Sequence, residues 1–195
     1  DDELIDLHSN NKKLMPFLHL PVQSGSSKIL KMMNRKYDVE FYRDIIFKIR
    51  DKSPNIEISS DFIIGYPGES EQDFINTLDL IDDIKFTQSY SFIYSARPGT
   101  KSAMIEDNLT KKVKSERLKI LQSKLTEIQH DFNKTHVGKK TSVLIENQSA
   151  TNPEYYFGRT PYMQSVYIKS NNLINGEEKD IKITSCNHKS LYGTC

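Results

Sequence analysis

The chain has 195 residues, of which 36% are hydrophobic and 27% are charged, a composition typical of folded globular proteins and not of disordered chains. No apolar run approaches the roughly 18 residues that a membrane-spanning helix needs, so no membrane partner is expected. The low cysteine content favours a reducing, cytoplasmic setting. Two cysteines, Cys186 and Cys195, are too few for a disulfide scaffold or a closed metal site.

Charge is unevenly distributed along the chain. Residues 1–100 carry 12 basic and 16 acidic side chains, whereas residues 101–140 carry 10 basic and 5 acidic ones. A basic segment of this kind either lies against a polyanion or forms the solvent-exposed face of a helix. Both interpretations stay open at this point.

The first hundred residues alternate short apolar runs with amphipathic stretches. The expected strands cover residues 17–22, 56–65 and 90–94. Helices are expected between them, with Ser26 or Ser27 as one N-terminal cap and Ser70 as another. Strands that alternate with helices over short connections indicate a parallel sheet. Three strands cannot close a barrel, so the pattern predicts part of a (β/α) barrel.

One long helix is expected over residues 111–135. Five apolar side chains recur there at helical spacing, and lysines such as Lys114 occupy the other positions; the five are Leu118, Leu121, Leu125, Ile128 and Phe132. This stripe favours packing on the sheet over a separate coiled coil, because it spans too few heptads.

The sequence becomes β-rich after His136. Short strand-like runs cover residues 141–145, 165–168 and 180–184, with glycines spaced regularly between them. This spacing predicts a small antiparallel β-barrel. We therefore expect two domains, one over residues 1–135 that includes the long helix and one over residues 136–195.

Polar loops follow each of the three expected strands. They cover residues 23–26, 65–69 and 95–100. Because the carboxyl ends of parallel strands meet at one edge of a sheet, the three loops together predict a ligand site there, with Gly25 allowing close approach of the backbone. The alternative is turn chemistry with a structural ion pair.

Few other residues indicate chemistry. His19 is expected to be an interior histidine with its hydrogen bonds satisfied, and Asp61 has no visible partner. Glu69 is expected to favour the N-terminus of the following helix. No serine or cysteine nucleophile stands beside a matching base, so no catalytic residue and no metal ligand are predicted.

The loop motifs as a set resemble those of a known family. They are LHLPVQSGS at residues 18–26, MNR at 33–35, DFIIGYPGE at 61–69 and FIYSARPGT at 92–100. In this order they are similar to the later barrel strands of the radical SAM methylthiotransferases. The tail, with GRTPYMQ at residues 158–164, is similar to that family's TRAM domain, an OB-like RNA-binding β-barrel.

The resemblance implies a cofactor and a missing part. Full-length members use S-adenosylmethionine (SAM) and two 4Fe-4S clusters, with three cysteines in an N-terminal domain and a C-x3-C-x2-C loop early in the barrel. Neither cysteine set occurs in these 195 residues. The chain therefore resembles only a C-terminal part of the family, and by itself it is expected to bind neither cluster and to be inactive.

The resemblance also assigns candidate binding residues. Gln23 and Ser24 correspond to the loop that faces the ribose and methionine of SAM, and Arg97 is a candidate for the SAM carboxylate or a substrate phosphate. The turn near the adenine corresponds to Ile63, Gly65, Pro67 and Gly68. Candidates for RNA phosphate contacts are Lys139, Lys140 and Arg159, for which ordinary solvent exposure is the alternative.

The implied activity is the addition of a 2-methylthio group to N6-dimethylallyladenosine beside the tRNA anticodon by a monomeric enzyme. Gln23-Ser24 and Met33-Asn34-Arg35 favour this branch over sister enzymes that act on threonylcarbamoyl-adenosine or on a ribosomal protein. A different class of function remains open, a stand-alone RNA-binding module without catalysis. Cysteine motifs encoded upstream of Asp1 would favour the enzyme.

Overall fold

The computed structural model describes residues 2–150 and 152–195. Two compact units are present. The first, here called the sheet unit, consists of Leu18–Leu125 with the N-terminal residues up to Asn11. The second, here called the barrel unit, consists of Thr126–Cys195 with Lys12–Phe17. The expected domain boundary after residue 135 lies beyond this division, which falls within a helix, and the assignment of domains stays a prediction.

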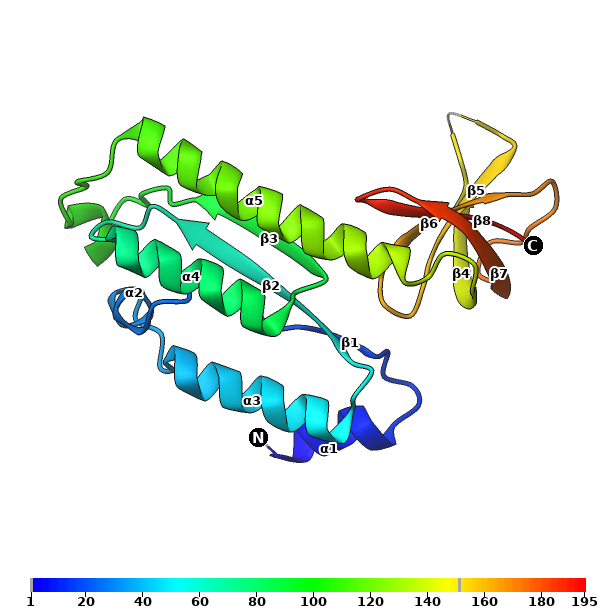
Figure 1. The fold of residues 1–195 in the computed structure, drawn as a ribbon, viewed down its shortest axis with the longest axis horizontal. Helices are drawn as coiled ribbons and strands as arrows, with labels where there is room; N and C mark the ends of the chain where they lie inside the picture. Colours follow the sequence, from blue (N-terminus) through cyan, green and yellow to red (C-terminus); the bar gives the residue numbers. More distant parts are fainter. Residues whose placement is uncertain (1, 151) are drawn as a thin grey trace. The chain divides into compact units, whose positions relative to one another are not determined.

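The sheet unit contains three parallel strands in the order β1-β2-β3 (Figure 1). Its strands are β1 (Phe17–His19), β2 (Glu57–Ile64) and β3 (Gln88–Ile93). Its helices are α1 (Asp2–Asn10), α2 (Ser27–Met32), α3 (Val39–Lys52), α4 (Glu71–Ile84) and the short 3-10 helix η1 (Lys101–Met104). The expected alternation of strands and helices is confirmed. The three strands form an open sheet, as expected for part of a barrel.

Local sequence determines where these helices begin. Ser26 caps α2, and its hydroxyl accepts the N–H of Ile29. Ser70 and Asp73 form a capping box at α4, in which each side chain accepts the backbone N–H of the other residue. Both expected caps are confirmed.

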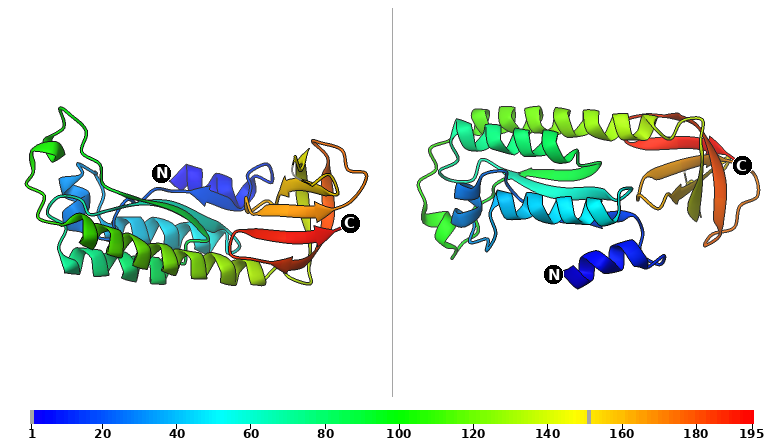
Figure 2. Two further views of the ribbon diagram at one scale, coloured as in Figure 1. Left: turned by 90° about the horizontal axis from the view of Figure 1, so that it is seen from above. Right: turned by 60° about the horizontal axis from the view of Figure 1, so that its bottom comes forward.

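Helices α3 and α4 lie along one face of the sheet (Figure 2). Phe62 and Ile64 of β2 are buried, as are Ile46 of α3 and Leu80 of α4. The opposite face is more open, and there Tyr90 and Phe92 of β3 are 64% and 57% exposed. This open face carries side chains that are free to meet a ligand.

Helix α5 (Lys111–Lys134) forms almost exactly where its period predicts, but its buried face differs from the expected one. Leu121 and Leu125 are buried as expected. Arg117 and Lys114, four and seven residues before Leu121 on the same face, are buried as well. Lys114, expected at a position off the apolar stripe, lies on the buried face together with Arg117, because both cations pair with carboxylates of the sheet unit.

The barrel unit is a closed barrel with the strand order β4-β5-β6-β8-β7. Its strands are β4 (Lys140–Gln148), β5 (Tyr155–Arg159), β6 (Ser165–Lys169), β7 (Glu178–Cys186) and β8 (Ser190–Thr194). Nine buried residues, among them Val143, Ile168 and Leu191, fill its interior. The expected small barrel is confirmed with one correction. It is not wholly antiparallel, since β8 lies between β6 and β7 and pairs in parallel with β6.

Candidate functional site

Residues at or beyond the carboxyl ends of the three strands of the sheet unit line one cavity of about 470 Å³. Gln23 and Arg97 come from the first and third polar loops, whereas Ile63 belongs to β2 and no residue of the second loop, 65–69, lines the cavity. The remaining lining residues are Arg35, Phe92, Ile93, Tyr94, Ser95, Thr100 and Ser102. The cavity thus lies at the carboxyl edge of the sheet between the first and third polar loops, and it combines two guanidinium groups, an amide and apolar walls.

The first segment is fixed by backbone pairing with β2. Gln23 adopts a positive φ of 74°, its N–H donates to the carbonyl of Asp61, and its carbonyl accepts the N–H of Ile63. Ser24 is buried, and its hydroxyl accepts the N–H of Ser26. Gly25 faces helix α4 instead of the cavity, since a methyl group there would lie 2.5 Å from the backbone of Thr77. The glycine thus allows close packing of loop and helix, and the expected approach of a ligand to this backbone stays a prediction.

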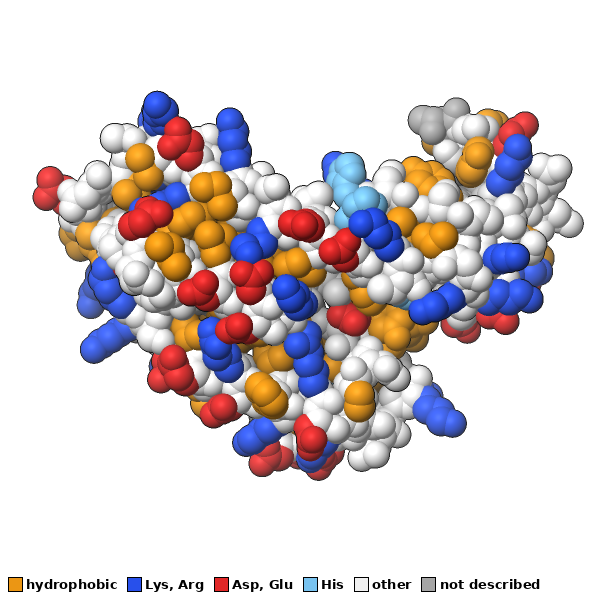
Figure 3. All heavy atoms as spheres, viewed as in Figure 1, with side chains coloured by type: hydrophobic (Ala, Val, Ile, Leu, Met, Phe, Trp, Pro, Cys, Tyr) orange, Lys and Arg blue, Asp and Glu red, His pale blue; other side chains and the backbone are white. Residues whose placement is uncertain are grey.

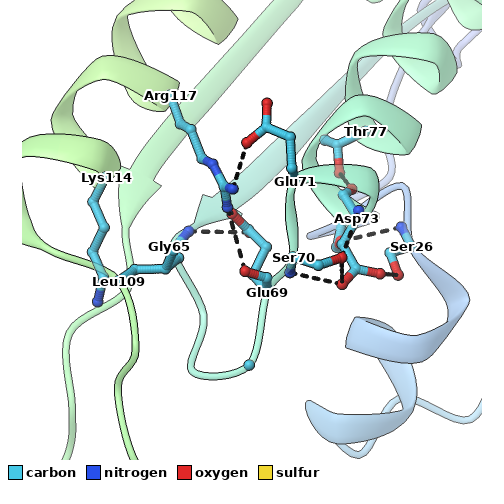
Figure 4. Close-up of polar contacts among 12 residues, drawn as sticks. Ser26, Gly65, Glu69, Ser70, Glu71, Asp73, Thr77, Leu109, Lys114 and Arg117 are labelled. Atoms are coloured by element: carbon cyan, nitrogen blue, oxygen red, sulfur yellow. Dashed lines mark hydrogen bonds and ion pairs between the residues drawn. The ribbon is translucent and has the colours of Figure 1, made fainter.

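The second segment is a turn held by a buried ion pair (Figure 4). The N–H of Gly65 donates to Glu69 Oε2 over 3.1 Å. The Nη1 atom of Arg117 donates to Glu69 Oε1 over 2.7 Å, and its Nη2 atom donates to Glu71 over 2.7 Å. Burial raises the pKa of Glu69, and the hydrogen bond from Arg117 opposes that rise. Glu69 is therefore a buried anchor of the turn, more than the helix-terminus charge expected from sequence.

The same turn is tied to the first loop through Asp73. Burial acts to raise the pKa of Asp73, but hydrogen bonds from Lys28, Ser26 and Ser70 outweigh it and hold the pKa well below its usual range. Lys28 Nζ also donates to the carbonyl of Gly68 over 2.9 Å. This network fixes the relative position of the two loops.

Three members of the predicted turn, Gly65, Pro67 and Gly68, do not line the cavity. Pro67 is buried, and Gly68, with φ of 85°, approaches the side chain of Met32. Gly65 has φ of 71°, and a methyl group there would lie 2.7 Å from Lys114 Cγ. The turn thus shapes the edge of the sheet, while Ile63 is its member in the cavity wall.

The open face of the sheet carries a histidine and an aspartate that the sequence did not pair. His19 Nδ1 lies 2.7 Å from Ser59 Oγ, and His19 Nε2 lies 3.6 Å from Asp61 Oδ2. His19 is exposed, so the expectation of an interior histidine is wrong, and Asp61 does have a partner. Period-two alternation places residues 59 and 61 on one face, but only the register with β1 identifies the pair.

The predicted RNA contacts of the barrel unit lie in two different settings. Lys139 and Lys140 are exposed, and Lys140 is the register partner of Lys182 on β7. Among the described residues, none of these three lysines forms an ion pair. Arg159 is half-buried, lies over the ring of Phe157 at 5.5 Å, and donates to Glu146 over 2.9 Å. The lysines are free to bind phosphate, whereas Arg159 already has partners.

Comparison with known proteins assigns both units. Residues 1–81 match the Radical SAM superfamily, and residues 134–195 match the TRAM domain. The N-terminal part of the chain is thus similar to the radical SAM superfamily, and its C-terminal part is similar to the TRAM domain. The resemblance to the radical SAM methylthiotransferases is also confirmed, by relatives that match nearly the whole chain.

Three of these relatives are named tRNA-2-methylthio-N(6)-dimethylallyladenosine synthase. The protein of Rickettsia felis is 51% identical over 98% of this chain. That of Rickettsia conorii is 50% identical over 99%, and that of Rickettsia bellii is 49% identical over 98%. The chain spans 43% of the length of each of these relatives.

Radical SAM proteins use SAM together with an iron–sulfur cluster, and the described residues fit only the first. A cavity with polar groups and apolar walls suits a nucleoside that carries a carboxylate. Within residues 2–150 and 152–195, no group of three or more His, Cys, Asp or Glu side chains could hold a metal. Cys186 and Cys195 both lie in the barrel unit. In the same residues, no helix is long and apolar enough to cross a membrane.

Proposed function

We propose that this chain is the SAM-binding and tRNA-binding part of a tRNA methylthiotransferase that forms the 2-methylthio derivative of N6-dimethylallyladenosine. The observation that carries the proposal is the 51% identity to such a synthase over 98% of the chain, which includes both units. A cavity lined by the first and third polar loops and by the ends of β2 and β3 supports it, because in β/α architectures ligands bind at the carboxyl ends of the strands. The names of the relatives specify dimethylallyladenosine, which favours this branch over the sister enzymes that act on threonylcarbamoyl-adenosine or on a ribosomal protein.

In this proposal the sheet unit binds and orients SAM. Arg97 pairs with the carboxylate of SAM, Gln23 hydrogen-bonds its polar groups, and Ile63 packs on the adenine. Ser24, Gly65, Pro67 and Gly68 act by holding the loops in place, in keeping with their burial and turn geometry. Bound SAM supplies the methyl group that a methylthiotransferase transfers, and the protein provides orientation and exclusion of water.

The described residues do not fit an iron–sulfur cluster, so we derive no step through one. A family member with both 4Fe-4S clusters needs ligands from polypeptide beyond these 195 residues, and the isolated chain is expected to be inactive. The chain's own residues fix the cavity edge through the Arg117–Glu69 pair and the Asp73 network. These contacts keep the loops in place before any ligand binds.

The barrel unit binds tRNA in this proposal, with the anticodon loop as the target. Lys139 and Lys140 contact phosphate groups, because both are exposed and lack a carboxylate partner among the described residues. Arg159 is a weaker candidate, since Glu146 already accepts its Nε–H. A tRNA substrate places the enzyme in the cytoplasm, and we propose that it acts as a monomer.

Nucleoside analysis of a deletion strain tests the proposed activity. Deletion of the gene that encodes these residues removes 2-methylthio-N6-dimethylallyladenosine from digested tRNA, and N6-dimethylallyladenosine accumulates. Re-expression of the complete gene restores the product. Persistence of the product in the deletion strain contradicts the proposal. Loss of a methylthio group from threonylcarbamoyl-adenosine or from a ribosomal protein instead identifies a sister enzyme.

Direct binding tests the role of Arg97. Equilibrium dialysis of radiolabelled SAM compares the 195-residue chain with Arg97→Ala and with the control Arg43→Ala, whose guanidinium pairs with Asp83 on the helical face. Loss of one charge-assisted hydrogen bond is expected to weaken SAM binding about tenfold in Arg97→Ala only. Equal binding by all three proteins removes Arg97 from the SAM site.

A further inference from the structure

A row of aromatic side chains crosses three neighbouring strands of the barrel. Phe157 of β5 is the register partner of Tyr167 of β6, which is in turn the partner of Tyr192 of β8. The rings of Tyr167 and Tyr192 are stacked, with centroids 5.7 Å apart and planes 21° apart, and Phe157 meets Tyr167 edge to face at 5.6 Å. We call these three residues the aromatic row.

The aromatic row lies on the outer face of the barrel. Its members are all partly exposed, while their chain neighbours Tyr156, Val166 and Leu191 are buried in the barrel interior. Residues on alternate positions of a strand point to opposite faces. The three rings therefore form one partly solvent-accessible strip instead of a part of the core.

Basic side chains flank the row along the strands. Arg159 lies two residues beyond Phe157 on β5, and Lys169 lies two residues beyond Tyr167 on β6. Glu178 and Asp180 lie on β7 in register with β4, and not with the strands of the row. Glu146 and Glu154 meet Arg159 and Lys169, so these flanking charges are partly compensated. The row is thus an apolar strip with cations on either side.

A cavity of about 380 Å³ adjoins the row. Tyr167 and Tyr192 form part of its wall, and Lys189 and Asn152 contribute polar groups. The hydroxyl of Tyr192 accepts the amide N–H of Asn187, which fixes this ring beside the cavity. Lys189 is exposed and forms no ion pair among the described residues. A cavity of this size, with an aromatic wall and a free cation, accommodates one nucleotide.

We propose that the aromatic row is a stacking platform for unpaired bases of RNA, with Lys189 contacting an adjacent phosphate. This inference rests on the proposed RNA-binding function and deepens it, because it assigns base contacts to residues that carry no charge. Aromatic rings that stack on bases beside a basic surface are the usual means by which proteins hold single strands. Cross-strand aromatic pairs also stabilise sheets, and the test must separate the two effects.

The test compares two probes of equal charge. Fluorescence anisotropy measures binding of the 195-residue chain to a fluorescein-labelled adenylate octamer and to an abasic ribose-phosphate octamer. Stacking on one base is expected to make the adenylate probe bind about tenfold more tightly. Tyr167→Leu and Tyr192→Leu are expected to remove this preference and to leave the affinity for the abasic probe unchanged. Thermal unfolding checks that each variant is folded.

Two further variants serve as controls. Tyr192→Phe keeps the ring but loses the hydroxyl that pairs with Asn187, so the preference for adenylate is expected to remain. Phe47→Leu removes an aromatic side chain that is 79% exposed on α3, and no change is expected. If the leucine variants do not fold, quenching of 2-aminopurine placed in the octamer reports stacking on the wild-type chain.

The outcomes separate this inference from the function on which it rests. Equal affinity of the wild-type chain for both probes, or unquenched 2-aminopurine in the bound octamer, overturns the stacking platform while phosphate binding survives. A preference for adenylate that persists in both leucine variants also overturns it. Failure of the chain to bind either probe at low salt contradicts RNA binding itself.

Discussion

The sheet unit and the barrel unit differ in where their charged side chains lie, because among the described residues the buried ones, Glu69, Asp73, Lys114 and Arg117, all belong to the sheet unit. In the sheet unit, cations on helices are paired internally: Arg117 with Glu69, Lys28 with Asp73, and Lys124 with Asp82. Acidic and basic side chains are accordingly interspersed over α3 and α4 (Figure 3). In the barrel unit, Lys140 and Lys182 face each other across two strands. Removal of a charge should therefore reduce stability in the first unit and RNA binding in the second.

The two units also differ in how their sheets end. The barrel closes on itself, so it leaves no unpaired strand edge. The sheet of the first unit is open, and Tyr90 and Phe92 of its last strand are largely exposed. Exposed edges and apolar side chains promote aggregation. The difference indicates that the sheet unit, and not the barrel unit, needs a covering partner or ligand.

The largest expected effect comes from Arg117→Ala, which tests whether internal pairing holds the sheet unit together. The substitution leaves Glu69 buried without its cation, and removal of one partner of a buried pair costs about 3–5 kcal/mol of unfolding free energy. Urea unfolding measures the loss. The control Lys124→Ala breaks the more exposed pair with Asp82 and should cost less than about 1 kcal/mol. Similar losses in both variants would contradict a special role for the Glu69 anchor.

Gly65→Ala should have the next largest effect. Its backbone has a positive φ, and an added methyl group would meet the buried stem of Lys114. Strain and the clash together should cost about 2 kcal/mol. Gly99→Ala is the matched control, because Gly99 also has a positive φ but no atom lies within 4 Å of the added methyl group. A smaller loss in Gly99→Ala, measured by the same urea titration, isolates the contribution of the clash.

Local patterns in the sequence were sufficient to predict much of this architecture. The caps Ser26 and Ser70 depend on contacts within three residues, and the period of α5 depends on one helix alone. The three polar segments were found because each directly follows a strand. Strands β5 and β8 were missed, since each has only five residues and includes a glycine that weakens its pattern.

The contacts that fix the candidate site could not be predicted in this way. Arg117 and Glu69 are 48 residues apart, and the buried cation interrupts an otherwise apolar stripe. His19 and Asp61 meet only through the register of β1 with β2. Helical or strand periodicity indicates which residues share a face, but not which distant residues they contact. Tertiary pairing therefore decides which charges are internal.

Glu57→Gln sharpens the comparison, because Glu57 departs from the pairing that is general in the sheet unit. Burial raises the pKa of Glu57 from 4.5 to about 7, and Arg50 only partly opposes the rise. The folded chain thus retains a proton that the unfolded chain loses, and the stability that Glu57 contributes declines as the pH rises from about 4.5 to 7. Between pH 4 and pH 8, the difference in unfolding free energy between the variant and the wild-type chain should shift by about 1 kcal/mol in favour of the variant, a figure reduced for solvent screening. Identical pH profiles of unfolding for both proteins would show that Glu57 is ionised normally.

Lys140→Gln has the smallest expected effect on stability and tests the barrel side of the comparison. Because Lys140 lies opposite Lys182, removal of one charge should raise the unfolding free energy of the barrel by a few tenths of a kcal/mol. The same change should weaken tRNA binding and reduce the slope of log affinity against log salt by about 0.7–0.9, as expected for one lost phosphate contact. Lys179→Gln is the control, because Lys179 of β7 already pairs with the carboxylate of Glu177. A gain in stability together with weaker salt-dependent binding would show that Lys140 serves RNA binding at a cost in stability. Unchanged binding in a filter assay would show that Lys140 and Lys182 do not contact RNA.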